Sequence, residues 1–338
     1  MLLVLIILLS LLATGFLYQW VGSRRDLKKY PPPGRVIAVD GTRLHIRVAG
    51  SGRTPVIFEA GVAASSVSWR PVQDAVAQFT STAAYDRAGF AWSGSSANAP
   101  NAAEMNDQLR ALLREAGLAP PYVLVGHSFG GFLMRLYAAR WPEEVAGLVL
   151  IDPALLQEWG SPTPDRLRML GRGVSLSRRG AWLARIGFVR FSLSMLTGGL
   201  RFLPKLLSQV TSGRGHAVSS KLVGEVRKLP VELWPAVQSH WCRPESFESM
   251  ARHLESLPAT ATAVAKTNPI RTIPVTVISG GHLTGEQSAE HEAIARASER
   301  GWHIIVPGSG HWVHLDDPDT VIGAIREMVS QATESHLT

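Results

Sequence analysis

The chain has 338 residues and a mass of 36.6 kDa, which is enough for one large domain or two small ones with a proper core. Apolar residues make up 46% and charged residues 18%, which excludes an intrinsically disordered chain. Cys242 is the single cysteine, so a disulfide framework within the chain and a cysteine-built zinc site are both excluded.

The net charge of +7 raises nucleic acid and anionic membranes as partners. Residues 155–268 hold 16 Lys/Arg and 7 Asp/Glu, a surplus of nine, so the rest of the chain sums to about −2. No zinc-finger spacing, RNA-binding aromatic motif or helix-turn-helix pattern accompanies this basic segment. We therefore expect no nucleic-acid partner.

The N-terminal segment 1–23 carries no charged side chain, and Leu2–Val21 is 20 residues long, sufficient to cross the hydrocarbon core of a bilayer. No basic residue precedes this run, as one would in a signal peptide, and four follow it directly between residues 24 and 29. The sequence therefore predicts a single-pass membrane anchor. The positive-inside rule places the rest of the chain in the cytoplasm. Residues 24–34, first basic and then proline-rich, are predicted to be a linker.

The body of the chain alternates strand and helix patterns on both sides of a long interruption. In chain order we expect a hairpin (35–40 and 43–49), a strand (55–60), a helix (69–79), a strand (81–85), a helix (102–116), a strand (122–125), a helix (132–141) and a strand (145–151). After the interruption come a strand (274–278), a helix (286–300), a strand (303–306) and a helix from Pro318.

This order predicts the α/β class: a mostly parallel eight-stranded sheet covered by helices and opened by an antiparallel hairpin. The core would comprise residues 35–154 and 269–338. The interruption, 155–268, lacks strand patterns and contains helical stretches broken by Gly and Pro. We interpret it as a helical cap inserted after the sixth strand.

Gly126-His127-Ser128-Phe129-Gly130 matches G-x-S-x-G, with a buried strand before it and a helix after it. That context exposes a serine hydroxyl at the carboxyl edge of the sheet, near a helix N-terminus that favours developing negative charge. Ser128 is therefore the candidate nucleophile. The alternative interpretation is a glycine-rich turn without chemistry.

A serine nucleophile needs a base. His311 follows the last strand in Gly308-Ser309-Gly310-His311, at the same sheet edge as Ser128, and is the candidate base. His314 lies closer to the start of the final helix, at Asp317-Pro318, and there we expect a structural role for it.

The acid that orients the histidine should lie between Ser128 and His311 in the chain. The loop after Ile278, Ser279-Gly280-Gly281-His282-Leu283, contains no carboxylate. Asp152, directly after strand 145–151, is the first candidate and Glu286 the second. A water or a backbone carbonyl would replace them if neither serves.

Acyl transfer also requires N–H donors for the negative oxygen that forms. The backbone N–H of Phe129, the residue after the nucleophile, is one candidate. The backbone N–H of Val62, in the loop that follows the third strand, is the other.

These segments together resemble the α/β-hydrolase superfamily, in its lipase/esterase and proline-iminopeptidase-like branch with a helical cap. The matching segments are FEAGVAASSVSW (58–69), YDRAGFAWS (85–93), YVLVGHSFGGFLMRLYAARWP (122–142), GLVLIDPA (147–154), IPVTVISGG (273–281) and GSGHWVHLDDPDTV (308–321). The resemblance implies a serine hydrolase without a cofactor or metal, and it carries over Ser128, His311 and the N–H groups of Val62 and Phe129. The chain departs from many members in the Gly-Gly-His-Leu loop, where they place the acid. Some related haloalkane dehalogenases place it after strand six, at the position of Asp152.

The predicted activity is hydrolysis of a small apolar or lipid-like carboxylic ester through an acyl-enzyme. One alternative is a proline-iminopeptidase-like amide or peptide hydrolase, which would need an acidic pocket for the substrate amine. The other is a ligand-binding or scaffold protein without catalysis. Between Arg166 and Lys205 basic residues alternate with large apolar ones, so the cap either docks on an anionic membrane or lines the substrate pocket.

Overall fold

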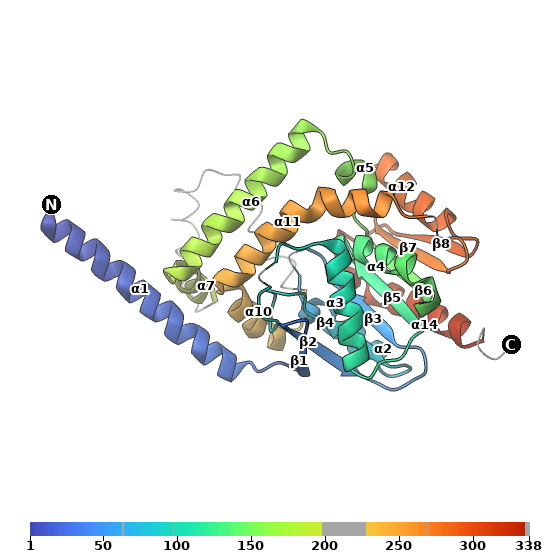
Figure 1. Cartoon of the computed structure of the whole chain (residues 1–338), viewed down its shortest axis with the longest axis horizontal. Helices are drawn as coiled ribbons and strands as arrows, with labels where there is room; N and C mark the ends of the chain where they lie inside the picture. The colour runs from blue at the N-terminus through green and yellow to red at the C-terminus, as the bar shows by residue number, and fades with distance from the viewer. Residues whose placement is uncertain (63, 97, 198–227, 269, 335–338) are drawn as a thin grey trace. The chain divides into compact units, whose positions relative to one another are not determined.

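The structure is a computed structural model that describes the chain except residues 63, 97, 198–227, 269 and 335–338 (Figure 1). Part of the predicted cap, 198–227, thus lies outside the described residues. The chain forms two compact units. One, here the anchor–cap unit, joins Met1–Pro31 to Gly173–Ala251, and the other, the sheet unit, joins Pro32–Arg172 to Arg252–Thr338. The N-terminal helix thus shares a unit with most of the segment assigned to the cap.

The sheet unit contains an eight-stranded sheet in the order β1-β2-β4-β3-β5-β6-β7-β8. β2 pairs antiparallel with β1 and β4, and every other pairing is parallel. The prediction of a mostly parallel sheet opened by an antiparallel hairpin is confirmed. The strands are β1 (Arg35–Val39), β2 (Thr42–Ala49), β3 (Val56–Glu59), β4 (Thr82–Tyr85), β5 (Tyr122–His127), β6 (Val145–Ile151), β7 (Val275–Gly280) and β8 (Gly301–Val306).

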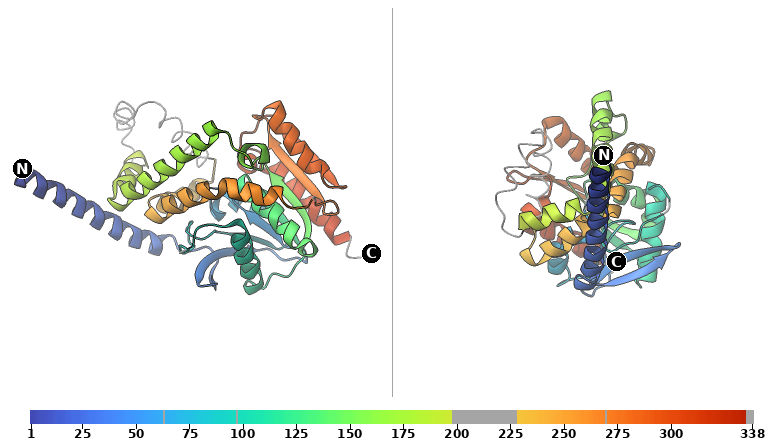
Figure 2. Two further views of the ribbon diagram at one scale, coloured as in Figure 1. Left: turned by 45° about the horizontal axis from the view of Figure 1, so that its top comes forward. Right: turned by 90° about the vertical axis from the view of Figure 1, so that its left-hand side faces the viewer.

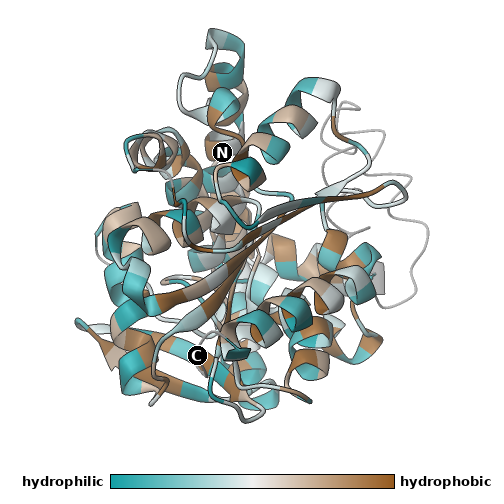
Figure 3. Cartoon of the chain, turned by 90° about the vertical axis from the view of Figure 1, so that its right-hand side faces the viewer, coloured by the Kyte–Doolittle hydropathy of each residue, from teal (hydrophilic) through white to brown (hydrophobic). Residues whose placement is uncertain are grey.

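Helices cover both faces of this sheet because its central strands are apolar on both sides. In the register of β6, Leu148 and Leu150 face one core, shared with α3, α4 and α12, whereas Val149 and Ile151 face a second core, shared with α2 and α14. Figure 3 shows the largely brown strands between helices that each carry brown and teal faces. The helices are α2 (Arg70–Val76), α3 (Ala102–Glu115), α4 (Phe129–Arg140), α5 (Leu156–Trp159), α12 (Gly285–Arg296), α13 (Val313–Asp316) and α14 (Pro318–Glu334), with short 3-10 turns at Ser66–Trp69 and Pro142–Glu144.

The described residues of the anchor–cap unit form helices joined by turns, without a strand among them. α1 (Leu2–Lys29) is one unbroken helix that continues past the apolar run into the segment predicted as a linker (Figure 2). It is the one described helix long and apolar enough to cross a membrane, a property shared by anchors and signal sequences. The other elements are α7 (Phe188–Thr197), α10 (Trp234–Trp241) and a 3-10 turn at Val231–Leu233, and two longer helices, α6 (Pro164–Arg185) and α11 (Pro244–Ala265), run across the boundaries of the two units.

The N-terminus of α4 packs against the end of β3 without room for a side chain. A Cβ on Gly130 would lie 2.6 Å from the Glu59 carbonyl oxygen and 2.9 Å from that of Ala60. We expect Gly130→Ala to lower the free energy of unfolding by about 1–3 kcal/mol, because backbone must move to admit the methyl group. Chemical denaturation measures the change.

Gly323→Ala in α14 is the matched control. A Cβ there meets nothing within 4 Å, so alanine's helix propensity should raise the free energy of unfolding by about 0.5–1 kcal/mol. Equal stability of the two variants would contradict the close approach of α4 to β3.

Candidate active site

Ser128 lies at the turn between β5 and α4 in a backbone conformation that non-glycine residues seldom adopt. Its φ is 53° and its ψ is −118°. Backbone hydrogen bonds hold it on both sides: its N–H donates to the Ile151 carbonyl at 3.0 Å, and its carbonyl accepts from Gly131 at 2.9 Å and Ala154 at 3.0 Å. The turn projects a partly exposed serine at the carboxyl edge of the sheet.

Asp152 follows β6 at the same edge and is buried. Its N–H donates to the Ile278 carbonyl at 2.7 Å, and its Oδ1 accepts from the Gly280 N–H at 3.1 Å. These bonds to β7 fix the carboxylate and leave Oδ2 directed at His311, whose Nδ1 lies 2.5 Å away. Hydrogen bonds to β7 therefore hold Asp152 in place independently of its contact with the imidazole.

His311 lies on the loop between β8 and α13. Its carbonyl accepts a hydrogen bond from His127 Nε2 at 2.9 Å, and the two rings pack with centroids 4.8 Å apart. Since Nδ1 faces the carboxylate of Asp152, Nε2 is the ring nitrogen left for another partner. In the described part of the chain no hydrogen bond joins His311 to the Ser128 hydroxyl. The two residues are nevertheless near each other, because His127 precedes Ser128 in the chain and its ring contacts His311.

Glu286, the second candidate acid, is exposed in the first turn of α12. Thr284 and Gln287 start that helix with a capping box, and across the described residues no hydrogen bond or ion pair joins Glu286 to His311. Asp152, and not Glu286, is the carboxylate bonded to His311. His314 is fully buried and stacks on Trp69 with centroids 4.3 Å apart, as the structural interpretation expects.

The loop after β3 lies beside Ser128. A Cβ on Gly61 would lie 3.1 Å from His127 Nδ1 and 3.5 Å from Ser128 Cβ, so a side chain there would press on the His127 ring. Across the described residues, neither the Val62 nor the Phe129 N–H finds a backbone or side-chain acceptor. Both candidate donors are thus without an acceptor in the described part of the chain.

Arg87 holds this loop, a role that sequence reasoning missed. Its guanidinium is buried and donates to the carbonyls of Ala60 at 2.7 Å and Gly61 at 2.6 Å, while also pairing with Glu59. Burial raises the pKa of Glu59, although the charge of Arg87 opposes this shift. Tyr85 donates a hydrogen bond to Glu59, and burial together with the charge of Glu59 raises the pKa of Tyr85. The sequence signal for this role was the position of two opposite charges: Glu59 ends β3, and Arg87 follows the adjacent strand β4.

Burial lowers the pKa of His127 well below its usual range, and the nearby His314 and His311 lower it further. His127 therefore stays neutral near pH 7 and acts as a spacer beneath the imidazole of His311 rather than as a second charge.

Asp152, His282 and His311 are the group of described residues whose ligand-type atoms, within 4.8 Å of one another, would suit a metal. The 2.5 Å separation of Asp152 and His311 is a hydrogen-bond distance. Two ligands of one tetrahedral zinc ion lie roughly 3.3 Å apart, given metal–ligand bonds near 2 Å. The arrangement thus fits an oriented imidazole better than a metal centre.

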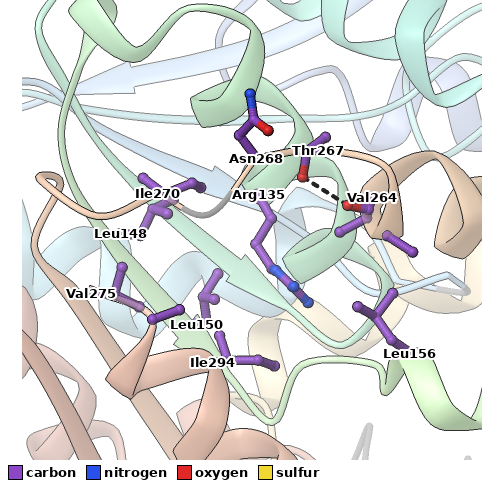
Figure 4. A pocket seen from close by; sticks show the side chains of 12 residues that line it. Arg135, Leu148, Leu150, Leu156, Val264, Thr267, Asn268, Ile270, Val275 and Ile294 are labelled. Atoms are coloured by element: carbon purple, nitrogen blue, oxygen red, sulfur yellow. Dashed lines mark hydrogen bonds between the residues drawn. The ribbon is translucent and has the colours of Figure 1, made fainter.

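A separate pocket of about 180 Å³ lies on the α4 and α12 face of the sheet (Figure 4). Its lining is mostly aliphatic, and none of Ser128, Asp152 or His311 belongs to it. Arg135 points into it; its Nη1 is buried and has no hydrogen-bond partner among the described residues. Burial lowers the pKa of Arg135 to about 10, opposed by the charge of Glu290, so the side chain stays cationic at neutral pH.

Comparison with known proteins agrees with this fold. A family model described as alpha/beta hydrolase fold matches residues 54–185. An uncharacterized Bacillus subtilis protein, YqjL, is 34% identical over 122 residues, 36% of this chain and 48% of that protein, so the chain spans about half the length of that relative. The mouse sn-1-specific diacylglycerol lipase ABHD11 is 27% identical over 240 residues, 70% of this chain and 68% of that protein. A solved esterase from Thermogutta terrifontis shares the fold with a TM-score of 0.57 at 20% identity, covering 88% of this chain and 97% of its own.

We expect Arg135→Met to raise the free energy of unfolding by about 1 kcal/mol, because methionine fills the apolar pocket without an unpaired buried charge. Glu290 would still accept hydrogen bonds from the N–H groups of Leu156 and Gln157. Urea denaturation of the purified protein measures the change.

Arg140→Met in the same helix is the matched control. Arg140 donates to the Ala103 carbonyl and to Asp107, both at 2.7 Å, so its loss should lower the free energy of unfolding by about 1 kcal/mol. Destabilisation by both changes would show that Arg135 has a partner in solution.

Proposed function

Because the chain belongs to the α/β-hydrolase superfamily, we propose that it is a serine hydrolase of carboxylic esters, with Ser128 as nucleophile, His311 as general base and Asp152 as the acid. The observation that carries the proposal is the 2.5 Å contact of Asp152 Oδ2 with His311 Nδ1, beside a serine at a strained strand-to-helix turn. That contact selects the tautomer in which Nε2 can accept a proton.

In the proposed reaction, Ser128 Oγ attacks the ester carbonyl carbon as His311 Nε2 takes the hydroxyl proton. The carbonyl oxygen becomes negative and is received by the N–H groups of Phe129 and Val62. The tetrahedral intermediate collapses, and His311 returns the proton to the leaving alcohol. Water, deprotonated by His311, then attacks the acyl-enzyme carbonyl carbon, and His311 returns that proton to Ser128 Oγ as the bond to the acyl group breaks. Asp152 stabilises the imidazolium at each stage.

An apolar or lipid-like ester is the proposed substrate class. The similarity to a protein named as a diacylglycerol lipase supports it, as does α1, which we propose to be a single-pass membrane anchor. The basic residues that follow the apolar run favour a cytoplasmic catalytic domain. No cofactor enters this mechanism. Amide hydrolysis is the competing activity, and a panel of p-nitrophenyl esters and aminoacyl amides distinguishes the two.

We expect Ser128→Ala to abolish ester hydrolysis and labelling by a fluorophosphonate probe, because no other nucleophile replaces the hydroxyl. Asp152→Asn should lower kcat by about 10⁴-fold while leaving the fold intact, since the imidazole would be held in the wrong tautomer. Steady-state kinetics and intact-protein mass spectrometry of the labelled chain provide the measurements.

Glu286→Gln is the matched control, and its kcat should stay within about twofold of the parent enzyme, as surface substitutions rarely propagate. The assignment of the acid fails if Glu286→Gln is the more damaging change. A folded parent protein that the probe does not label would instead favour a binding or scaffold role.

Arg87 is proposed as a positioning residue for the donor loop. Arg87→Lys keeps the charge beside Glu59 but loses the fork that holds two carbonyls at once. We expect kcat to fall about tenfold with KM little changed, because the loop acts on the transition state. Arg110→Lys weakens a comparable pair, with Glu144 at 2.7 Å, away from the loop. It should reduce stability alone; equal kcat losses would refute a positioning role.

A further inference from the structure

The turn between α6 and α7 packs directly on the backbone of α1. A Cβ on Gly15 would lie 2.3 Å from the Ile186 carbonyl oxygen. On the other side, Gly187 has a φ of 74°, and a Cβ there would lie 2.7 Å from the Gly15 carbonyl oxygen. Glycine on both sides therefore allows a backbone-to-backbone contact at the level of residue 15.

Polar bonds fix the same helices against sliding. Arg190 in α7 donates to Asp26 at 2.6 Å and to Gln19 Oε1 at 3.0 Å. Gln19, only 5% exposed, also donates to the Cys242 carbonyl at 2.8 Å. The depth of the α6–α7 turn is therefore set relative to α1 by contacts on two successive parts of that helix.

This depth has a consequence if α1 spans a bilayer, as proposed above. At 1.5 Å per residue, Gly15 lies about 9 Å inside the end of the apolar run at Val21. A span that stopped at Thr14 to keep the turn in water would measure about 20 Å, whereas the hydrocarbon core is about 30 Å thick. The turn must then lie below the membrane surface.

The exposed side chains of the α6–α7 hairpin suit that position. Trp182, Leu183, Phe188 and Phe191 flank the turn and are 56%, 40%, 44% and 46% exposed. The opposite face of α6 is buried at Val174, Ser177, Ala181 and Ala184. α6 therefore has a buried face and, opposite it, a second apolar face that is exposed.

Basic residues stand where headgroups would meet the hairpin. Arg178 and Arg179 are exposed about one turn before Trp182 and Leu183, a spacing at which long cationic side chains reach phosphates while their stems stay in apolar surroundings. Arg185, nearest the turn, pairs with Glu248. Exposed arginines and exposed apolar side chains thus occur together along α6, a composition that suits a membrane interface.

We propose that the α6–α7 hairpin, residues 174–191, is inserted in the lipid leaflet from which α1 emerges, with its turn below the headgroups. This inference rests on the proposed anchor and extends it, because part of the cap would lie in the membrane together with α1. The partner is lipid, which fits an apolar surface bounded by arginines.

Depth-dependent quenching tests the proposal on the full chain. With Cys242→Ser as background, Phe188→Cys and Leu183→Cys report on the hairpin, Leu8→Cys on the anchor and Glu327→Cys, exposed in α14, on water. Each variant is labelled with an environment-sensitive fluorophore and reconstituted into phosphatidylcholine–phosphatidylglycerol vesicles that contain acyl-chain-brominated lipid. We expect residues 188 and 183 to be quenched several-fold more than residue 327 and comparably to residue 8.

The controls separate this inference from the anchor. If residue 8 is quenched while residues 188 and 183 behave like residue 327, α1 spans the membrane and the hairpin proposal is overturned. If residue 8 also behaves like residue 327, both the anchor and the hairpin proposals fail.

Discussion

The hydrogen bond between Asp152 and His311 is the interaction on which the proposed chemistry depends. Its strength as an orienting contact comes from what holds Asp152: the residue bonds through its N–H and its Oδ1 to two backbone groups of β7. The carboxylate is thus a fixed part of the sheet edge, and the more exposed histidine is the group that must adapt. Such preorganisation lets the carboxylate stabilise a charged imidazole without first rearranging its surroundings.

Close backbone packing brings the remaining groups to the same edge. The loop after β3 lies close to Ser128 at Gly61, and α4 approaches β3 because Gly130 has no side chain. Arg87 then fastens that loop through two carbonyls and neutralises part of the cost of burying Glu59. The buried pair of Arg87 and Glu59 need not add net stability. Through its contacts with Glu59 and with two loop carbonyls, Arg87 fixes the loop that carries one candidate oxyanion donor.

In the anchor–cap unit, a close backbone contact between α1 and the α6–α7 turn is combined with hydrogen bonds between polar side chains of α1 and α7. Glycines at 15 and 187 allow the contact, and Arg190 with Asp26 and Gln19 sets its register. If α1 spans a membrane as proposed, its packing on α7 and on the α6–α7 turn also sets the depth of that turn. Lipid-like substrates would then be met at the surface where they reside, which joins the two proposals physically.

The sequence by itself determined the order and class of the secondary elements and the serine at the strand-to-helix turn. Strand Val145–Ile151 was predicted residue for residue, because a short apolar run between turn residues is a local pattern. The tertiary structure alone decided which carboxylate meets His311, since Asp152 and Glu286 both precede it in the chain and only the pairing of β6 with β7 carries Asp152 there. It also decided that α1 runs to Lys29 and packs on α7, and that Arg87 holds the loop after β3. These are contacts between residues far apart in sequence, which local propensity and periodicity do not encode.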